Sequence, residues 1–193
     1  ESSLSMAYFR SGDVAQAIAG FEKGIERGEE ILKRDPQNRS VRASLAGVHQ
    51  NLGQVLLEQQ RYAEAARHFE KSLSAAGQGS AGDVSGQMSA SLARIGLGRI
   101  ARDQNRLEEA EAHFSAAVRT LEKLIPGSRD HRVLLNLAIA YSRMGDVSRL
   151  RGKPVAALNF YTRALPITDE LIAVDSRNAV AMSARAECLS RIA

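Results

Sequence analysis

The sequence is poor in the residues that usually build one large globular core. It has no Trp, only 5% aromatic residues and a single cysteine among 193 residues. Because Cys188 is alone, a disulfide within the chain and a zinc site built from several cysteines are both excluded. A hydrophobic content of 44%, made mostly of small and aliphatic residues, is instead typical of many helices packed along a line.

Long apolar runs and a strong charge of one sign are also missing. No run approaches the roughly 18 consecutive apolar residues of a membrane-spanning helix, and no secretory signal is visible. The 26 basic residues, of which 21 are Arg, face 22 acidic ones, and the net charge of +4 is spread along the whole length. Binding to nucleic acid needs a concentrated basic face. We therefore expect neither a membrane nor a nucleic acid as partner, and we expect a cytoplasmic location.

The sequence does contain a fourfold internal repeat. Four alanines, at successive spacings of 48, 45 and 47, are each followed four positions later by an aromatic residue. A Ser or Gly stands twelve positions before each alanine. The small, alanine and aromatic positions of the four copies are Ser5, Ala17 and Phe21; Gly53, Ala65 and Phe69; Gly98, Ala110 and Phe114; and Gly145, Ala157 and Tyr161. A period this regular is typical of stacked repeats.

Each copy reads as two helices joined by a short turn. Preferred N-cap residues precede the first helix of successive copies at Asn38, Asp83, Asp130 and Asn178. In the second copy, an apolar stripe from Val41 to Leu56 predicts a first helix over 39–59, and a second helix is predicted over 62–75. The matching second helices are expected at Val14–Ile25, Leu107–Val118 and Pro154–Leu165. No stretch shows the alternation of a strand, so the fold is predicted to be all-α.

Glycine interrupts this pattern once. Four glycines occur between Gly77 and Gly86, where the other copies continue a helix. The second helix of that copy is therefore predicted to end early, followed by a mobile link.

These residues resemble the tetratricopeptide repeat, whose pattern is Trp-x2-Leu-Gly-x2-Tyr, then Ala-x3-Phe, then Pro. The second copy matches with His49, Leu52, Gly53, Leu56, Ala65 and Phe69, and the fourth with Tyr141, Met144, Gly145, Ser148, Ala157 and Tyr161. The repeat is longer than the tetratricopeptide period, as the alanine spacings show, and the closing Pro is absent. The sequence is thus most similar to long-period bacterial arrays, some of which follow a serine/threonine kinase domain. Armadillo, HEAT and pentatricopeptide arrays fit these offsets less well.

The resemblance implies a right-handed α-α superhelix, a tetratricopeptide-like solenoid of four helix pairs plus a terminal helix. A single array would cover 1–193, with repeats at 1–37, 38–82, 83–129 and 130–177, and with 178–193 as a capping helix or a cut fifth repeat. Because the chain opens within a repeat, we expect it to be a fragment. In the terminal helix we expect Met182, Cys188, Leu189 and Ile192 to pack on the fourth pair, and Arg185, Glu187 and Arg191 to face water.

In proteins of this kind the first helix of each pair lines a concave groove, and the resemblance implies a scaffold that binds a protein or peptide and has no enzymatic activity. The ligand-facing positions carried over to this chain are Gln50, Asn51, Gln54, Glu58, Arg99, Arg102, Arg143, Asp146 and Arg149, with Asp103 and Ser142 beside them. Because arginines dominate, an acidic peptide or a carboxylate terminus is the expected ligand. The alternatives are a regulatory or sensory region of a signalling protein such as a kinase, and a structural element that associates end to end with other copies.

We find no catalytic, cofactor or metal site in the sequence. His68 and His113 occupy the same repeat position, about one repeat apart, which is too far for ligands of one metal ion. His49 and His131 are read as structural in the same way, and Cys188 has no base near it in sequence. The expectation is a binding module with no cofactor.

Overall fold

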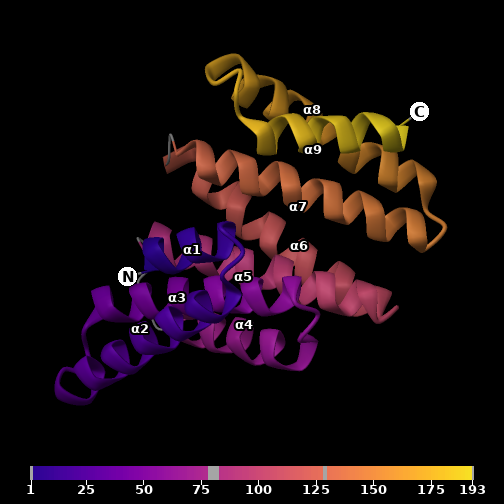
Figure 1. Ribbon diagram of the computed structural model, residues 1–193. Coiled ribbons are helices and arrows are strands. Elements are labelled where there is room, and N and C mark those ends of the chain that lie inside the picture. The colour runs from indigo at the N-terminus through magenta and orange to yellow at the C-terminus, as the bar shows by residue number, and fades with distance from the viewer. Residues whose placement is uncertain (1, 78–82, 128–129, 193) are drawn as a thin grey trace. The chain divides into compact units, whose positions relative to one another are not determined.

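The computed structural model describes residues 2–77, 83–127 and 130–192, and all regular structure within these ranges is helical (Figure 1). The prediction of an all-α fold is confirmed. The helices are α1 (Ser2–Arg10), α2 (Val14–Arg34), α3 (Arg39–Glu58), α4 (Tyr62–Gly77), α5 (Val84–Asp103), α6 (Leu107–Leu124), the short 3-10 helix η1 (Ile125–Gly127), α7 (His131–Leu150), α8 (Pro154–Val174) and α9 (Ala179–Ile192).

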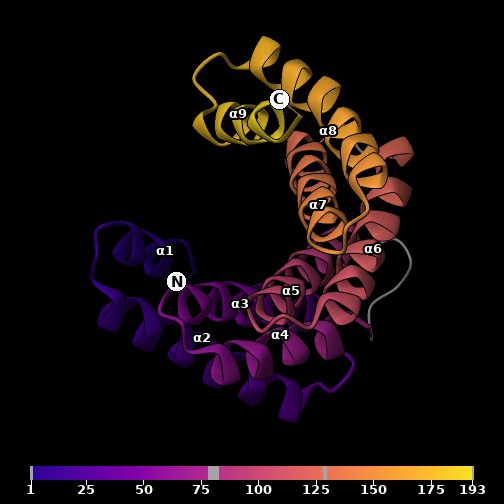
Figure 2. The same ribbon diagram turned by 90° about the vertical axis from the view of Figure 1, so that its right-hand side faces the viewer.

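The chain forms two compact units, Glu1–Ile100 and Ala101–Ala193, named here unit 1 and unit 2. In unit 1, α2 packs on α1 and α3, and α3 packs on α4. In unit 2, α7 lies between α6 and α8, and α8 also packs on α9 (Figures 1 and 2). The boundary between the units falls within α5, so the single array of four repeats stays a prediction.

The predicted N-caps are confirmed at all four positions, because each side chain accepts a hydrogen bond from a backbone N–H of the first turn. The bonds are Val41 N to Asn38 Oδ1 (3.1 Å), Gly86 N to Asp83 Oδ1 (2.9 Å), Arg132 N to Asp130 Oδ1 (2.9 Å) and Ala181 N to Asn178 Oδ1 (3.0 Å). A cap of this kind typically stabilises a helix by about 1 kcal/mol, which explains why the helices begin where the sequence predicts.

The turns inside the helix pairs share one backbone conformation. The residue at the same repeat position has a positive φ each time, at Gly12 (88°), Gln60 (58°), Asn105 (58°) and Gly152 (69°). A left-handed residue breaks the helical hydrogen-bond pattern, so the next helix can start in the opposite direction. In the second copy, α4 is described over 16 residues, to Gly77, whereas α2 has 21, and the residues that would test the predicted early end of this helix lie at 78–82, outside the described ranges. The link predicted to be mobile lies largely outside the described residues, at 78–82.

The repeated small and aromatic residues pack against each other. Phe21, Phe69, Phe114 and Tyr161 are all at most 1% exposed. A Cβ atom added to Gly53 would lie 2.7 Å from the ring of Phe69, and one added to Gly145 would lie 2.4 Å from the ring of Tyr161. The glycine is therefore required because the aromatic ring lies directly against the backbone of the first helix.

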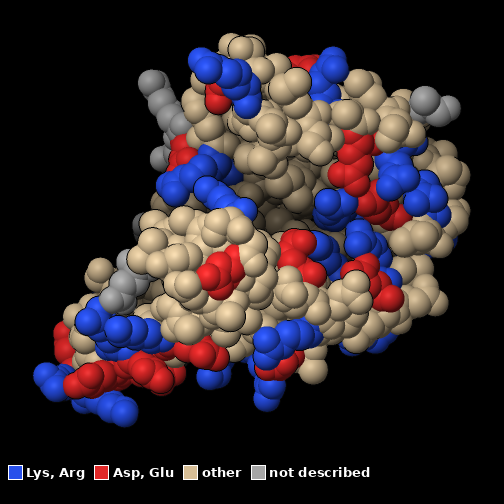
Figure 3. All heavy atoms as spheres, in the orientation of Figure 1, with Lys and Arg blue, Asp and Glu red and all other residues tan. Residues whose placement is uncertain are grey.

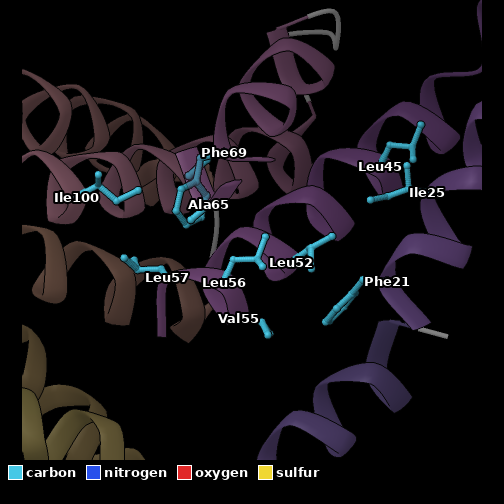
Figure 4. Close-up of a cluster of buried hydrophobic side chains, with 11 residues drawn as sticks. Phe21, Ile25, Leu45, Leu52, Val55, Leu56, Leu57, Ala65, Phe69 and Ile100 are labelled. Atoms are coloured by element: carbon cyan, nitrogen blue, oxygen red, sulfur yellow. The ribbon is translucent and has the colours of Figure 1, made fainter. Parts of the chain in front are cut away.

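The core of unit 1 follows the apolar stripe of α3. Figure 4 shows Leu52 and Leu56 on α3 between Phe21 of α2 and Phe69 of α4. These four side chains are at most 2% exposed. Burial of each contributes roughly 1.5–3 kcal/mol to stability, so α3 is the element around which the helices of unit 1 pack.

The terminal helix packs differently from the prediction. Of the four apolar residues expected to face the fourth pair, only Cys188 is buried, while Met182, Leu189 and Ile192 are exposed. The buried side of α9 consists instead of small residues, Ala181 and Ala184, together with Cys188. Small side chains allow a close approach to α8, and the larger apolar residues are left on the outer face.

Candidate functional site

The predicted groove residues lie on the first helices of the pairs and fall into two groups. Gln50, Asn51, Gln54, Glu58 and Arg99 belong to unit 1, and Arg102, Arg143, Asp146 and Arg149 belong to unit 2. Gln50 is buried, with 9% exposed, and therefore offers little surface to a ligand. The remaining residues of each group come together within their own unit.

In unit 1 the polar strip consists of Ser2, Asn51, Gln54, Glu58 and Arg99. Asn51 Nδ2 donates to Ser2 Oγ (3.1 Å), and Gln54 Nε2 donates to Glu58 Oε1 (2.5 Å). Arg99 Nη1 lies 3.4 Å from Gln54 Oε1, and Arg99 Nη2 lies 3.7 Å from Glu58 Oε1. The strip thus connects three successive first helices: Ser2 of α1 bonds to Asn51 of α3, and Gln54 of α3 meets Arg99 of α5. Gln54 and Arg99 share a repeat position, because each directly follows the glycine of its repeat.

In unit 2 the Asp146 cluster consists of Asp146, Tyr161, Arg102, Arg143 and Arg191. The Tyr161 hydroxyl donates to Asp146 Oδ1 (2.9 Å), and Arg143 Nη1 donates to Asp146 Oδ2 (3.2 Å). Arg191 Nε lies 3.4 Å from Oδ1, and Arg102 Nη1 lies 4.0 Å from Oδ2. The Asp146 side chain is only 7% exposed, so this carboxylate is a buried charge surrounded by donors.

Burial explains why the cluster needs this many donors. A buried carboxylate is strongly destabilising unless it is paired and hydrogen-bonded. One of these hydrogen bonds comes from the hydroxyl of Tyr161, which stands at the aromatic position of the repeat, where the other copies have Phe. Burial and the neighbouring charge of Asp146 raise the pKa of Tyr161 to about 12, so its hydroxyl keeps its proton at neutral pH. Arg149 also interacts with this hydroxyl.

The arginines of the Asp146 cluster are matched by acidic groups of the same unit. Arg102 pairs with Asp103 at 2.7 Å, and Arg143 Nη1 also pairs with Glu187 at 2.9 Å. Three arginines thus face Asp103, Asp146 and Glu187, and the charges of the cluster balance. Figure 3 shows the same mixture, with basic and acidic side chains next to one another on the visible face. This region is therefore not a one-signed patch.

Two members of this network were predicted to face water. Arg191 is exposed as predicted, with 40% of its side chain accessible, but its Nε also contacts Asp146. Glu187 is only partly exposed and pairs with Arg143. A signal for this was present, because Asn51, Arg143 and Arg191 stand at the same offset from the N-cap residues of their helices and so share one repeat position. Treating α9 as the first helix of a fifth copy, one of the two alternatives for 178–193, indicates the contact of Arg191 with Asp146.

The structure also brings together two histidines that were interpreted separately. His49 Nδ1 of α3 lies 3.1 Å from His68 Nδ1 of α4. The same repeat positions in the fourth copy hold Tyr141 and Phe160, whose rings stack at 6.4 Å. Burial, and then the neighbouring His68 and Lys71, lower the pKa of His49 to about 4.

Clusters that would support other chemistry are absent from the described part of the chain. Within residues 2–77, 83–127 and 130–192, no group of three or more His, Cys, Asp or Glu side chains converges as a metal site would require. Over the same ranges, none of the helices combines the length and the apolar character needed to cross a bilayer.

Comparisons with known proteins agree with the internal repeats. Two family models described as tetratricopeptide repeat match residues 3–81 and 43–123, and together they extend from residue 3 to residue 123. A search of curated proteins found no match. Among solved structures, BtubC (BKLC) from P. vanneervenii superposes with a TM-score of 0.63 at 18% identity, over 88% of this chain and 62% of its own. MamA superposes with a TM-score of 0.52 at 16% identity, over 97% of this chain and 93% of its own. The chain thus spans less than two thirds of the length of BtubC.

Proposed function

The chain belongs to the tetratricopeptide repeat family, whose members generally act as scaffolds for interactions between proteins, and from this premise we propose that its polar strip in unit 1 binds an acidic segment of a partner protein. The role is binding without catalysis.

The observation that carries the proposal is the exposure of Glu58, the acidic group that Arg99 meets within the strip. The guanidinium nitrogens of Arg99 lie 3.4 Å from Gln54 and 3.7 Å from Glu58. The Glu58 side chain is 44% exposed and can turn into solvent. Because exposed ion pairs contribute only about 0–1 kcal/mol, a partner carboxylate can replace Glu58 at little cost.

The amides beside Arg99 suit an extended peptide. Asn51 and Gln54 each carry a donor and an acceptor, which can match the alternating N–H and C=O groups of a peptide backbone. Both are partly exposed, and they lie between α1 and α5 within one unit. A peptide crossing α3 would thus meet Asn51 and Gln54 before its carboxylate meets Arg99.

The Asp146 cluster is less suited to the same task. Its arginines hold a buried carboxylate, and removing one partner of such a buried pair typically costs about 3–5 kcal/mol, although the partial exposure of these arginines reduces that figure. A ligand that displaced Asp146 would have to overcome this cost. The arginines of unit 2 therefore stabilise the unit, and the arginine of unit 1 is better placed to bind a partner.

The test uses a phage-displayed library of random peptides selected on the full chain. Enriched peptides would be synthesised and their affinities measured by fluorescence anisotropy. We expect enrichment of Asp and Glu, and a loss of affinity of about tenfold for Arg99→Gln, corresponding to about 1.4 kcal/mol. The affinity should also fall as salt concentration rises.

The matched control is Arg67→Gln, which removes an exposed arginine of the same unit from the second helix α4. Its affinity for the same peptides should equal that of the unaltered chain. Selected peptides that bind Arg99→Gln as tightly as the unaltered chain would contradict the proposal. Charge reversal of Arg102 or Arg143 is avoided because it would place a second carboxylate beside Asp146.

A further inference from the structure

One face of α9 in unit 2 is exposed at positions that are buried in other first helices. Counted from the N-cap of each helix, Ala186 and Leu189 of α9 correspond to Ala46 and His49 of α3. Ala46 and His49 are buried, because α4 packs on α3. Ala186 is exposed, and Leu189 is 41% exposed beside a cavity of about 460 Å³. The face that a second helix covers in the second copy is therefore open to solvent on α9.

The second half of α2 in unit 1 is exposed in a complementary way. Counted from the repeat alanine, Ile31 of α2 corresponds to Leu124 of α6 and Leu171 of α8. Leu124 and Leu171 are at most 7% exposed, whereas Ile31 is 45% exposed. Ile31 also lines a surface cavity of about 580 Å³ with Arg27 and other residues of the same helix end. A position that is apolar and buried in other second helices is thus apolar and open in α2.

The two open faces belong to matching halves of one helix pair. The 9 residues of α1 correspond to the last part of α3, 50–58, and the 14 residues of α9 correspond to its first part, 39–52. Because the helices of a pair are antiparallel, α1 lies beside the first half of α2, and the first part of a first helix would lie beside the second half. We propose that α9 of one molecule docks against α2 of a second molecule of this chain, as α3 packs on α4 within unit 1.

The packing of α3 on α4 indicates which residues would meet. Ser72 Oγ of α4 donates to the carbonyl oxygen of Ala46 at 2.8 Å, so the two backbones approach closely at this point. Ala186 of α9 and Gly24 of α2 hold the same repeat positions. Gly24 is partly exposed and has no side chain, so the backbone of a second molecule can approach it as closely.

Opposite charges stand at the neighbouring positions of the two faces. In unit 1, Leu45 of α3 and Ser74 of α4 line one cavity. Arg185 of α9 and Glu26 of α2 hold these positions, and both side chains are exposed. Docking would bring a guanidinium and a carboxylate together, and such charge complementarity favours correct register and suppresses wrong pairings. The charges therefore favour α2 as the occupant of the α9 face.

The same docking would cover an apolar surface at the start of α8. Within unit 2, Arg151 after α7 pairs with Glu108 of α6 at 3.0 Å. The residue of α8 that corresponds to Glu108 is Val155, which is 82% exposed. The residue that corresponds to Arg151 in the first copy is Ser11, directly after α1. A second molecule would therefore bring an uncharged residue, and not an arginine, to this apolar surface.

Three repeat positions are present in both helices, because 190–192 of α9 correspond to 2–4 of α1. One of these two helix ends must therefore open on docking. The side chains at 190–192 are all exposed, and terminal turns unfold locally at little cost in free energy. Leu4, which is exposed in the single molecule, would then take the place that Leu52 has in the core of unit 1.

A contact of this kind is heterologous, since the two molecules use different faces. Each docked molecule keeps one face open, so association can continue beyond a pair. Because α9 is short, we expect a Kd on the order of 10–100 µM. Sedimentation velocity of the full chain, prepared without an affinity tag at concentrations from about 5 µM to about 1 mM, should show a mass that rises with concentration.

Two single variants test the two faces separately. Leu189→Glu places a charge on the α9 face, and Ile31→Glu places one on the α2 face. Both replaced side chains are exposed, so circular dichroism should show unchanged helicity. Each variant alone should associate at least tenfold more weakly than the unaltered chain. Mixed in equal amounts, they should form a dimer, because one variant keeps the α2 face and the other keeps the α9 face.

The matched control is Val180→Glu, which changes an exposed apolar residue of the same helix. Val180 corresponds to Arg39 of α3 and Arg132 of α7, and both of these are exposed although their helices are covered by α4 and α8. The position therefore lies outside the proposed contact, and this variant should associate as the unaltered chain does.

Three results would overturn the proposal. The first is an unaltered chain that sediments as a monomer up to about 1 mM, ten times the weakest Kd expected. The second is a single variant that associates as tightly as the unaltered chain. The third is a mixture of the two variants that stays monomeric while the unaltered chain associates. None of these measurements involves a peptide, so the outcome is independent of the proposed partner binding.

Discussion

The two units place different chemistry at the same repeat position, the residue after the repeat glycine. In unit 1 this residue is Gln54 or Arg99, and both side chains remain partly exposed over a strip of hydrogen bonds. In unit 2 it is Asp146, which is buried and held by the hydroxyl of Tyr161 and by arginines. Where unit 1 has the amide of Gln54, unit 2 has the buried carboxylate of Asp146, and the arginines around Asp146 therefore serve to compensate its charge.

The difference shows how to distinguish binding arginines from structural ones in a repeat protein. Both units present arginines on their first helices, although Arg99 stands at the repeat position of Asp146 and not at that of Arg143. The arginines of unit 2 compensate a buried charge, whereas Arg99 pairs with the exposed Glu58. The exposure of the acidic partner, more than the exposure of the arginine, therefore indicates which arginine a ligand can use.

The largest effect should come from removing the buried carboxylate. Asp146→Ala leaves the hydroxyl of Tyr161 and the guanidinium of Arg143 without their buried acceptor, so we expect unit 2 to lose about 3 kcal/mol of stability. Native-state amide hydrogen exchange of α7 and α8 would measure this free energy. Gln54→Ala, at the same repeat position in unit 1, should cost less than about 0.5 kcal/mol in α3 and α4. Equal losses in the two units would refute the contrast drawn between them.

A somewhat smaller effect is expected when a methyl group is forced under the repeat aromatic. Gly145→Ala and Gly53→Ala should each destabilise their unit by about 1–3 kcal/mol, because the new Cβ atom meets the ring of Tyr161 or Phe69. The loss should be greater for Gly145→Ala, since the hydrogen bond to Asp146 prevents the Tyr161 ring from moving aside. Thermal unfolding followed by circular dichroism, with Tyr161→Phe as the background for a second comparison, would check this order.

Acid should affect unit 1 through the histidine pair. The pKa of His49 is about 4 in the folded chain and near 6.5 when unfolded, so the unfolded state binds more protons between these values. The stability contributed by the neutral ring is fully present above a pH of about 6.5 and is lost as the pH falls toward about 4. We expect a loss of about 1–3 kcal/mol, reduced from the full shift by solvent screening. Hydrogen exchange of α3 and α4 amides at several pH values would measure it.

The control for this prediction is the double variant His49→Tyr with His68→Phe, which introduces the ring pair found at the same repeat positions in the fourth copy, Tyr141 and Phe160. Its α3 and α4 amides should lose less stability over the same pH range, because neither new side chain titrates there. A parallel loss in the variant and the unaltered chain would assign the acid sensitivity to other groups.

The smallest effect on stability should come from Arg99→Gln. Because Arg99 is partly exposed and the Glu58 side chain that it meets is 44% exposed, we expect a change below about 0.5 kcal/mol in unit 1. Arg143→Gln should cost more, since this arginine serves Asp146 and Glu187 at once. Chemical denaturation of both variants would compare them, and a larger loss for Arg99→Gln would reverse the assignment of binding and structural arginines.

Local signals in the sequence predicted the elements well. Asn38, Asp83, Asp130 and Asn178 cap helices as expected, because a cap depends on residues only two or three positions apart. The repeated offsets also identified the glycine and aromatic positions, which the structure shows to be packed against each other at Gly53 and Phe69 and at Gly145 and Tyr161. The contact of His49 with His68 was not predicted, because no local signal links ring positions on the two helices of a pair, although Tyr141 and Phe160 stand at the same places.

By itself, the sequence determined that the chain is helical, where its helices start, and at which positions the small and aromatic residues of the repeat recur. These features depend on spacing along the chain, and four copies repeat the spacing. Only the tertiary structure decided that Asp146 is buried and that two residues of α9 join its cluster, Arg191 by contacting Asp146 and Glu187 by contacting Arg143. It also decided that the Nδ1 atoms of His49 and His68 lie within hydrogen-bond distance. The physical reason is that burial and ion pairing depend on distances between side chains of different helices, which the repeat period leaves undefined.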